Sequence, residues 1–399
     1  MARNADNGLV TEDLNSLFRQ NQGFPEDFGI FANFRLETVP AGRVLAGRLR
    51  AELTPDSPEV REYLGRWPGY AGQREGPQGW ELFLVEPTVR RERWWLHGVL
   101  LALTLFSTVV AGSLLAGQTP ILFTGLHLFD EWWLPVPLMV DFRALVPGLP
   151  FGLALVTVLA VHEAGHYFTA RHHRISVTPP FFIPFPPYIS IIGTLGAFIR
   201  LRSPVLTRPV LLDVGVAGPL LSFAASLPLL WWGLLRSQVV LVLAEMPSRY
   251  MVHFAGQEQF WLGGSLVLKG MARLTLGVSG TGELLILHPL AFAGWLGLFV
   301  TALNLLPISQ LDGGHILYAL LGSRQRPLAW VFFALLIPLG LLWAGWWVWA
   351  TLVFAIGRGR VQHPPLFNDQ ESPRGRRLWL GLAAGLMFAL SFVPIPFLL

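Results

Sequence analysis

The sequence predicts a polytopic α-helical membrane protein, with about seven transmembrane helices behind a small N-terminal α+β soluble domain. Of 399 residues, 53% are hydrophobic and 14% charged, with 16 Trp and 28 Phe, more apolar and aromatic than soluble enzymes usually are. Residues 1–95 nevertheless hold 14 of the 25 acidic and 12 of the 29 basic residues. We therefore expect a soluble head over residues 1–93 and a membrane-embedded domain over residues 94–399.

Composition also excludes several classes of site and partner. The absence of cysteine excludes disulfides and thiolate metal sites, so histidines and carboxylates are the strong metal ligands available. The net charge of +4 comes from arginines at the ends of apolar stretches and not from a basic stripe, so we expect no nucleic-acid partner. The N-terminus lacks the apolar core of a signal peptide, which predicts a cytoplasmic head and a multi-pass protein of the cell membrane.

The head and the first spans follow from hydrophobic patterning. Residues 43–53 and 80–85 alternate between apolar and polar side chains, as strands do. Residues 94–123 carry no charge and are long enough to cross a bilayer, which takes about 20 apolar residues. Residues 126–143 contain acidic residues among aromatics and prolines, which indicates an outer loop or an interfacial helix. Residues 144–170 form the second expected span.

The remaining spans are separated by prolines and arginines. Residues 179–187 hold five prolines, which rules out a continuous helix there. Further apolar stretches lie at residues 209–235, 284–306, 327–357 and 378–398. The stretch 327–357 is either one long span or a hairpin broken at Pro338 and Gly340. Arginines flank it on both sides, and because basic loops prefer the cytoplasmic side, the hairpin is favoured.

The chemistry begins at an HExxH motif, His162-Glu163-Ala-Gly-His166, inside the second span. Histidines at i and i+4 lie on one face of a helix and suit a single Zn²⁺. Glu163, next to a ligand, can take a proton from the attacking water and give it to the leaving amine. The alternative is that the motif occurs by chance on a solvent-exposed face of an amphipathic helix. An ionisable side chain in a span costs roughly 2.5–3.5 kcal/mol, so a metal site is the stronger interpretation.

The third ligand is expected from residues 304–315, the other dense polar group of the membrane domain. If successive spans alternate in direction, the second and fourth are parallel and their C-terminal ends share a depth. Pro307 interrupts the helix there, which would turn Asp312 inward. Because a catalytic zinc takes three protein ligands and keeps one open position, we expect His162, His166 and Asp312 to bind Zn²⁺.

The depth of this site follows from the helix rise. At about 1.5 Å per residue, His162 lies roughly 18 Å from Pro150 and roughly 13 Å from Arg171. The expected site is therefore nearer the basic, cytoplasmic end of its span.

Together, HExxH and the sequence Asn304-Leu-Leu-Pro-Ile-Ser-Gln-Leu-Asp312-Gly resemble the paired signature, HExxH with NxxPxxxLDG, of the site-2 protease family (peptidase M50). These are intramembrane zinc metalloproteases. Residues 193–200 and 213–219 are similar to the same family, in particular to the branch of the chloroplast EGY-type proteases. The resemblance implies that His162, His166 and Asp312 bind zinc, that Glu163 is the catalytic acid/base, and that Asn304 positions or polarises the substrate carbonyl.

The same resemblance implies a metalloendopeptidase that acts on membrane-spanning protein substrates in the lipid bilayer. It would cut within or near the cytoplasmic side, in regulated intramembrane proteolysis or membrane protein turnover. The competing class is a membrane protein without protease activity, such as a metal carrier or an inactive homologue. A carrier has no use for Glu163 or Asn304, and an inactive homologue would be expected to lack one of them, so the protease is favoured.

Three further features keep two interpretations each. His315 either faces the metal or, more simply, hydrogen-bonds locally. Asp213 either orients a ligand histidine or pairs with Arg208. Residues 193–199 either pair with an unwound substrate as an added strand or form a loop that lines a cavity. His172 and His173, beside arginines at the membrane edge, are not expected to be ligands.

Overall fold

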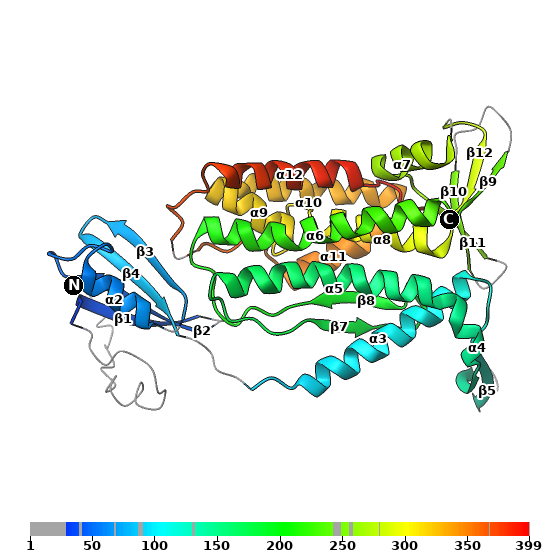
Figure 1. Cartoon of the computed structure of the whole chain (residues 1–399), viewed down its shortest axis with the longest axis horizontal. Helices are drawn as coiled ribbons and strands as arrows, with labels where there is room; N and C mark the ends of the chain where they lie inside the picture. The colour runs from blue at the N-terminus through cyan, green and yellow to red at the C-terminus, as the bar shows by residue number, and fades with distance from the viewer. Residues whose placement is uncertain are drawn as a thin grey trace, which may run out of the picture. The chain divides into compact units, whose positions relative to one another are not determined.

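The computed structural model describes residues 29–39, 42–67, 69–86, 91–129, 132–241, 249–254, 258–278, 280–366 and 368–398. The first 28 residues of the predicted head, with Asp130 and Glu131, lie outside the described residues. Two compact units are present (Figure 1). The head unit comprises Met1–Val89, Arg174–Ser176 and Leu201–Leu206, and the membrane unit comprises Arg90–His173, Val177–Arg200 and Thr207–Leu399.

The head unit is a four-stranded antiparallel sheet with one helix against it. In sheet order, the strands are β1 (Phe31–Val39), β2 (Gly42–Leu49), β4 (Gly79–Val85) and β3 (Ala71–Gly76). Helix α2 (Pro58–Arg66) buries Val60 and Tyr63 against Leu45 and Leu84. The predicted α+β character is confirmed, although the strand expected over residues 43–53 ends at Leu49.

In the described part of the membrane unit, four helices are long and apolar enough to cross a membrane (Figure 1). They are α3 (Trp94–Leu115), the run of α4 (Phe142–Leu145), η1 (Val146–Gly148) and α5 (Leu149–His172), then α6 (Arg208–Leu234), and the run of α9 (Asp312–Leu321), η2 (Gly322–Arg324) and α10 (Gln325–Leu342).

Seven spans are not confirmed. The other expected spans are the shorter helices α8 (Pro289–Asn304), α11 (Gly345–Ile356) and α12 (Arg376–Ser391), of 16, 12 and 16 residues. At about 1.5 Å per residue they measure roughly 24, 18 and 24 Å, against a hydrocarbon core of about 30 Å.

The segment expected as an outer loop or interfacial helix, Leu126–Arg143, is mainly strand, so the interfacial helix is wrong and the outer loop stays a prediction. Strands β5 (Ile121–Phe129) and β6 (Trp132–Val140) form an antiparallel ribbon. Aromatic and branched residues favour strand, and a two-stranded ribbon has edge positions where a proline without an N–H is tolerated. The first span also stops earlier than expected, at Leu115, because Gly117 adopts a left-handed φ of 75° just past the helix end.

The expected hairpin over residues 327–357 is present as two antiparallel helices, but its break lies elsewhere. Helix α10 continues through Pro338 to Leu342, and the chain turns at Trp343, whose backbone is extended (φ −153°, ψ 115°). The rings of Phe333 and Phe354 lie 5.9 Å apart across the pair. The indole N–H of Trp347 donates to the carbonyl of Ile337 at 2.9 Å.

Two further sheets complete the membrane unit. Strands β7 (Phe181–Pro184) and β8 (Thr194–Phe198) pair antiparallel within the proline-rich connection. A five-stranded sheet comprises, in order, β13 (Phe397–Leu398), β11 (Glu258–Leu262), β10 (Arg249–Phe254), β12 (Glu283–Ile286) and β9 (Gln238–Leu241), and helix α7 (Leu266–Leu276) joins β11 to β12.

The helices around the centre of the membrane unit approach closely at glycines. A Cβ at Gly233 would lie 2.1 Å from the nitrogen of Ala291, and one at Gly294 would lie 2.6 Å from the nitrogen of Leu230. Only a residue without a side chain permits such contacts between α6 and α8. Helices α5, α6 and α8 are thereby fixed around a shared interior, which contains the polar residues of the candidate site.

Candidate metal centre

Helix α5 carries the first three polar residues of the site. His162, Glu163 and His166 are each at most 8% exposed, although the helix around them is apolar. Residues four apart share one helix face, so both imidazoles point to the same side. Because buried polar groups need partners, the rest of the structure must supply them.

Asp312 reaches this face through a tight turn. Helix α8 ends at Asn304, and Asp312 is the first residue of α9. In the turn between them, Ser309 has a left-handed φ of 52°. A Cβ at Gly313 would lie 2.0 Å from the carbonyl oxygen of Leu305, so the turn closes over the start of α9 only because this residue is glycine.

Three potential ligand atoms form a small triangle. The Nε2 atoms of His162 and His166 are 3.1 Å apart, and Oδ2 of Asp312 lies 3.3 Å and 3.4 Å from them. Ligands at about 2.0–2.1 Å from a tetrahedral zinc lie about 3.3–3.4 Å from one another. Among the residues that the structure describes, this is the one group of three or more His, Cys, Asp or Glu side chains placed to hold a metal ion. The donor set and its spacing fit Zn²⁺.

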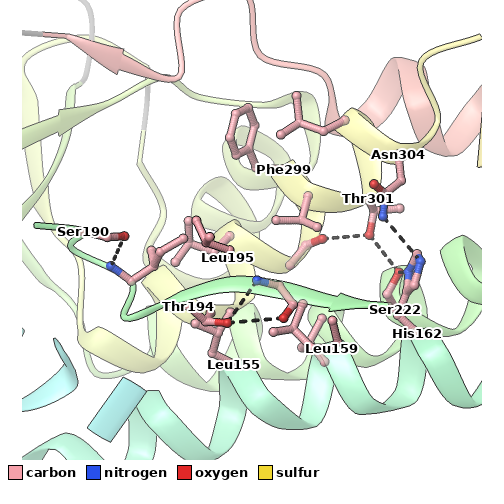
Figure 2. A pocket seen from close by; sticks show the side chains of 18 of the residues that line it. Leu155, Leu159, His162, Ser190, Thr194, Leu195, Ser222, Phe299, Thr301 and Asn304 are labelled. Atoms are coloured by element: carbon pink, nitrogen blue, oxygen red, sulfur yellow. Dashed lines mark hydrogen bonds between the residues drawn. The ribbon is translucent and has the colours of Figure 1, made fainter. Parts of the chain in front are cut away.

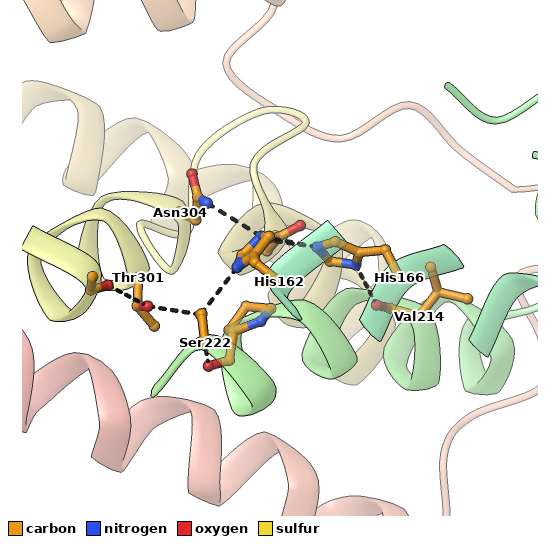
Figure 3. A network of polar contacts seen from close by, with 9 residues as sticks. His162, His166, Val214, Ser222, Thr301 and Asn304 are labelled. Carbon is orange, nitrogen blue, oxygen red and sulfur yellow. Dashed lines mark hydrogen bonds and ion pairs between the residues drawn. The ribbon is translucent and has the colours of Figure 1, made fainter. Parts of the chain in front are cut away.

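Hydrogen bonds orient both histidines with Nε2 toward the triangle (Figure 3). Nδ1 of His166 donates to the carbonyl of Val214 at 2.8 Å, because a carbonyl only accepts. Nδ1 of His162 lies 3.0 Å from Oγ of Ser222, which lies 2.8 Å from Oγ1 of Thr301. Thr301 donates its proton to the carbonyl of Gly297. The proton of Ser222 has two acceptors, Oγ1 of Thr301 and the carbonyl of Pro219 at 3.2 Å, so the Ser222 oxygen accepts from His162. The Nε2 atoms of both rings therefore carry no proton and can act as metal ligands.

Glu163 and Asn304 lie beside the triangle. Asn304 ends α8, and its Nδ2 is 3.4 Å from Nε2 of His162. Glu163 accepts a hydrogen bond from the backbone N–H of Ile199, just past β8. These two polar side chains and His162 share one cavity wall, so a base and an amide donor are available next to the ligands.

The cavity measures about 570 Å³ and is mostly apolar. Figure 2 shows its walls: Leu155 and Leu159 come from α5, Thr194 and Leu195 from β8, and Phe299 from α8. Such a cavity suits an apolar chain segment, with polar groups concentrated at one place.

The structure also places the residues whose roles were left open. His315 is not in the metal group, and its Nδ1 lies 2.9 Å from Nε2 of His363. Asp213 contacts neither a ligand histidine nor Arg208 by a hydrogen bond in the described residues. Instead it lies 3.1 Å from Nε2 of His173 and accepts two hydrogen bonds from Arg377, at 2.8 and 2.9 Å. Residues 194–197 of the 193–199 segment are strand and line the cavity.

Sequence reasoning missed Ser222, Thr301 and the carbonyl of Val214. The two hydroxyl residues lie in apolar helices, so polarity within a span was a signal. Every residue has a backbone carbonyl, so a sequence does not indicate which carbonyl accepts a hydrogen bond from a histidine.

Comparison with known proteins then gives a family match. The model of peptidase family M50 matches residues 150–344. Over these residues the chain is similar to peptidase family M50. The M50 match contains both polar motifs, at residues 162–166 and 304–313.

Several curated relatives of this chain are named as zinc metalloproteases. The "Probable zinc metalloprotease EGY2, chloroplastic" of Arabidopsis thaliana is 31% identical over 261 residues, which is 64% of this chain and 44% of the relative. The protein of the same name from Oryza sativa subsp. indica is 29% identical over 73% of this chain and 49% of its own length. The "Probable zinc metalloprotease EGY1, chloroplastic" of Oryza sativa subsp. japonica is 32% identical over 46% of this chain and 30% of the relative.

The chain spans less than half the length of these curated relatives. No solved structure matches it.

Proposed function

We propose that this chain is a zinc-dependent intramembrane endopeptidase that hydrolyses peptide bonds of membrane-spanning proteins. The observation that carries the proposal is the triangle of two imidazole nitrogens and one carboxylate oxygen with edges of 3.1–3.4 Å, beside a glutamate in an apolar cavity. The match to peptidase family M50 and the names of the relatives support the same activity.

Each polar residue has a role in this proposal. His162, His166 and Asp312 hold the ion, and a zinc ion so held supplies a nucleophile from water and polarises the scissile carbonyl. Glu163 takes the proton of the attacking water and passes it to the leaving amine. The amide of Asn304 donates a hydrogen bond to the carbonyl oxygen, where negative charge develops.

The cavity suggests how a substrate is held. In the described structure, β8 pairs with β7 alone, so its other edge is open to an added strand. A helical substrate must unwind before its peptide bonds are accessible, and pairing with β8 would compensate the backbone groups that unwinding exposes. The apolar residues of the cavity then contact the side chains of the unwound segment.

The proposed location is the cell membrane, with the head on the cytoplasmic side. His162 is ten residues, about 15 Å, from the C-terminal end of α5 at His172. Arginines concentrate at that end, as they do on the cytoplasmic side of membrane proteins. The bond that is cut would therefore lie in the cytoplasmic part of the bilayer, in regulated proteolysis or in turnover of membrane proteins.

Cleavage of a model single-span substrate by the purified chain in detergent tests the proposal. Glu163→Gln keeps the shape of the site but removes the base, so cleavage should fall at least about 100-fold. A zinc chelator should abolish cleavage, and added zinc should restore it. Glu75→Gln, on β3 of the head unit, is the matched control and should cleave like wild type. Equal cleavage by wild type, Glu163→Gln and the chelated sample would refute the proposal.

A further inference from the structure

A second pair of histidines lies outside the lining of the cavity. His315 is on α9, and His363 is in the segment Val361–Leu366, which follows α11. Nε2 of His363 lies 2.9 Å from Nδ1 of His315, and the two ring centroids are 4.9 Å apart. His363 is 7% exposed and its ring also packs on Tyr318, at a centroid distance of 4.5 Å. This histidine pair joins residues 48 positions apart in the sequence.

Hydrogen-bond partners fix where the protons of the pair lie. Nδ1 of His363 is 2.5 Å from the carbonyl oxygen of Pro364, which only accepts, so Nδ1 carries a proton. Burial, with the neighbouring His315 imidazole, lowers the pKa of His363 to about 3, so the ring is neutral and its Nε2 is an acceptor. His315 must therefore donate its Nδ1–H to His363.

The segment Val361–Leu366 contacts the chain on both sides of Asp312. Before Asp312, Ser309 donates its backbone N–H to the carbonyl of Val361 at 2.6 Å. After Asp312, the His315 side chain donates to His363. The turn between α8 and α9 and the first turn of α9 are thus both hydrogen-bonded to the segment Val361–Leu366.

The same turn of α9 packs closely on α6. A Cβ at Gly215 would lie 3.3 Å from Cβ of His315 and 3.6 Å from the carbonyl oxygen of Asp312. Gly215 follows Val214, whose carbonyl orients His166. A rotation of α9 would therefore move Asp312 relative to the two histidines of α5.

We propose that His363 is a positioning residue for Asp312, acting through its hydrogen bond with His315. The bond sets the rotation of α9 at which Oδ2 of Asp312 lies 3.3 and 3.4 Å from the two ligand nitrogens. This inference rests on the proposed function, because it treats Asp312 as a metal ligand. It assigns a role to residues outside both sequence motifs.

Metal binding by variants of the full chain tests this role without an activity assay. His363→Gln retains an acceptor near the position of Nε2, whereas His363→Leu fills the space without one. Co²⁺ is the probe, read by its visible absorption bands, and zinc affinity is measured by chelator competition. We expect wild type and His363→Gln to give the same cobalt spectrum. His363→Leu should give altered bands and bind zinc about 10-fold more weakly.

A control variant separates positioning from general destabilisation. His288 is a half-buried histidine that caps α8 at the end opposite Asn304, accepting from the N–H of Leu290. His288→Leu should lower the thermal unfolding temperature of the metal-free protein while leaving the cobalt spectrum unchanged. If His363→Leu does not fold, His315→Asn, which keeps a donor near Nδ1, is compared with His315→Leu in the same way.

The outcomes distinguish failure of the positioning role from failure of the proposed function. Wild-type spectrum and affinity in His363→Leu, or in His315→Leu where that variant is used, would overturn the positioning role and leave the proposed function intact. Altered cobalt bands in His363→Gln equal to those in His363→Leu would also overturn it, because packing and not the acceptor would then matter. Wild-type protein that binds no cobalt would overturn the proposed function itself.

Discussion

At the scale of single residues, the orientation of His162 depends on hydroxyls from two other helices. Ser222 on α6 accepts from its Nδ1, and Oγ1 of Thr301 on α8 lies 2.8 Å from Oγ of Ser222. Both hydroxyls are buried, at 2% and 0% exposed, so water does not replace them when they are removed. The tautomer that a metal needs is therefore set by the packing of three helices.

Replacing Ser222 by alanine should weaken zinc binding about 10-fold, because the His162 ring loses the partner of its Nδ1–H. Competition with a chromophoric chelator measures the affinity. Ser226→Ala is the matched control. Ser226 lies one turn further along α6 and donates only to the carbonyl of Ser222 in the described hydrogen bonds, so its loss should leave the zinc affinity within about twofold. Equal affinities for both variants would contradict a role for Ser222.

The five polar residues around the triangle could be predicted because they belong to two motifs with fixed spacing. Ser222 could not, since hydroxyl residues in apolar helices usually bond to a carbonyl of their own helix, as Ser226, Thr275 and Ser222 itself do. No periodicity distinguishes a serine that faces a histidine of another helix. His363 is missed for a related reason, because its partner is 48 residues away.

At the scale of elements, the contact between α5 and α6 depends on two glycines. A Cβ at Gly165 would lie 2.5 Å from the carbonyl oxygen of Ala217, and one at Gly218 would lie 2.1 Å from Nε2 of His166. The imidazole thus occupies the space that a side chain on α6 would fill. Close packing leaves no room for it to move aside.

Gly218→Ala should therefore abolish measurable zinc binding, since the added methyl displaces the ring that carries a ligand atom. Zinc content after dialysis measures the effect. Gly385→Ala on α12 is the control, because a Cβ there meets nothing within 4 Å. It should retain zinc and be slightly stabilised, as exposed Gly→Ala changes in helices are. Zinc retention by Gly218→Ala would show that α6 does not confine His166.

The element ends, in contrast, follow poorly from hydropathy. An apolar stretch predicts a helix but not where the helix stops. Helix α3 ends at Leu115, eight residues before the predicted limit at residue 123, because Gly117 follows it with a left-handed φ. Pro338 does not end α10, and the turn comes at Trp343. The ribbon β5–β6 was missed because its apolar residues do not alternate with polar ones, which is the pattern that predicts a strand.

At the scale of the whole molecule, the buried His363 makes stability depend on pH. Its pKa lies near 3 in the folded protein and about 6.5 when unfolded, so between these values the unfolded state binds more protons. The free energy of unfolding should therefore fall as the pH falls below about 6.5, by about 2 kcal/mol at pH 5. Denaturant titrations of metal-free protein at pH 7 and pH 5 measure it. His363→Gln should show a smaller loss, and an identical loss would refute the assignment.

The two ends of the membrane unit differ in charge, which predicts its orientation. Contacts of Asp213 with His173 and Arg377 bring the end of α5 and the starts of α6 and α12 to one end. The opposite end of the membrane unit contains the five-stranded sheet and the C-terminal ends of α3 and α6. The first end carries arginines in or next to the helix ends, at positions 171, 324, 358, 374, 376 and 377. It should therefore face the cytoplasm.

Single cysteines test this orientation directly, because the chain has no cysteine of its own. Gln118 follows α3 and Arg374 precedes α12, and both are exposed. In intact cells a membrane-impermeant maleimide should label Gln118→Cys and not Arg374→Cys, whereas opening the membrane should allow both to be labelled. The unmodified chain, which must remain unlabelled, is the control. Labelling of Arg374→Cys from outside would reverse the orientation, and would place the triangle of ligands, about 15 Å from the end of α5, nearer the outer face.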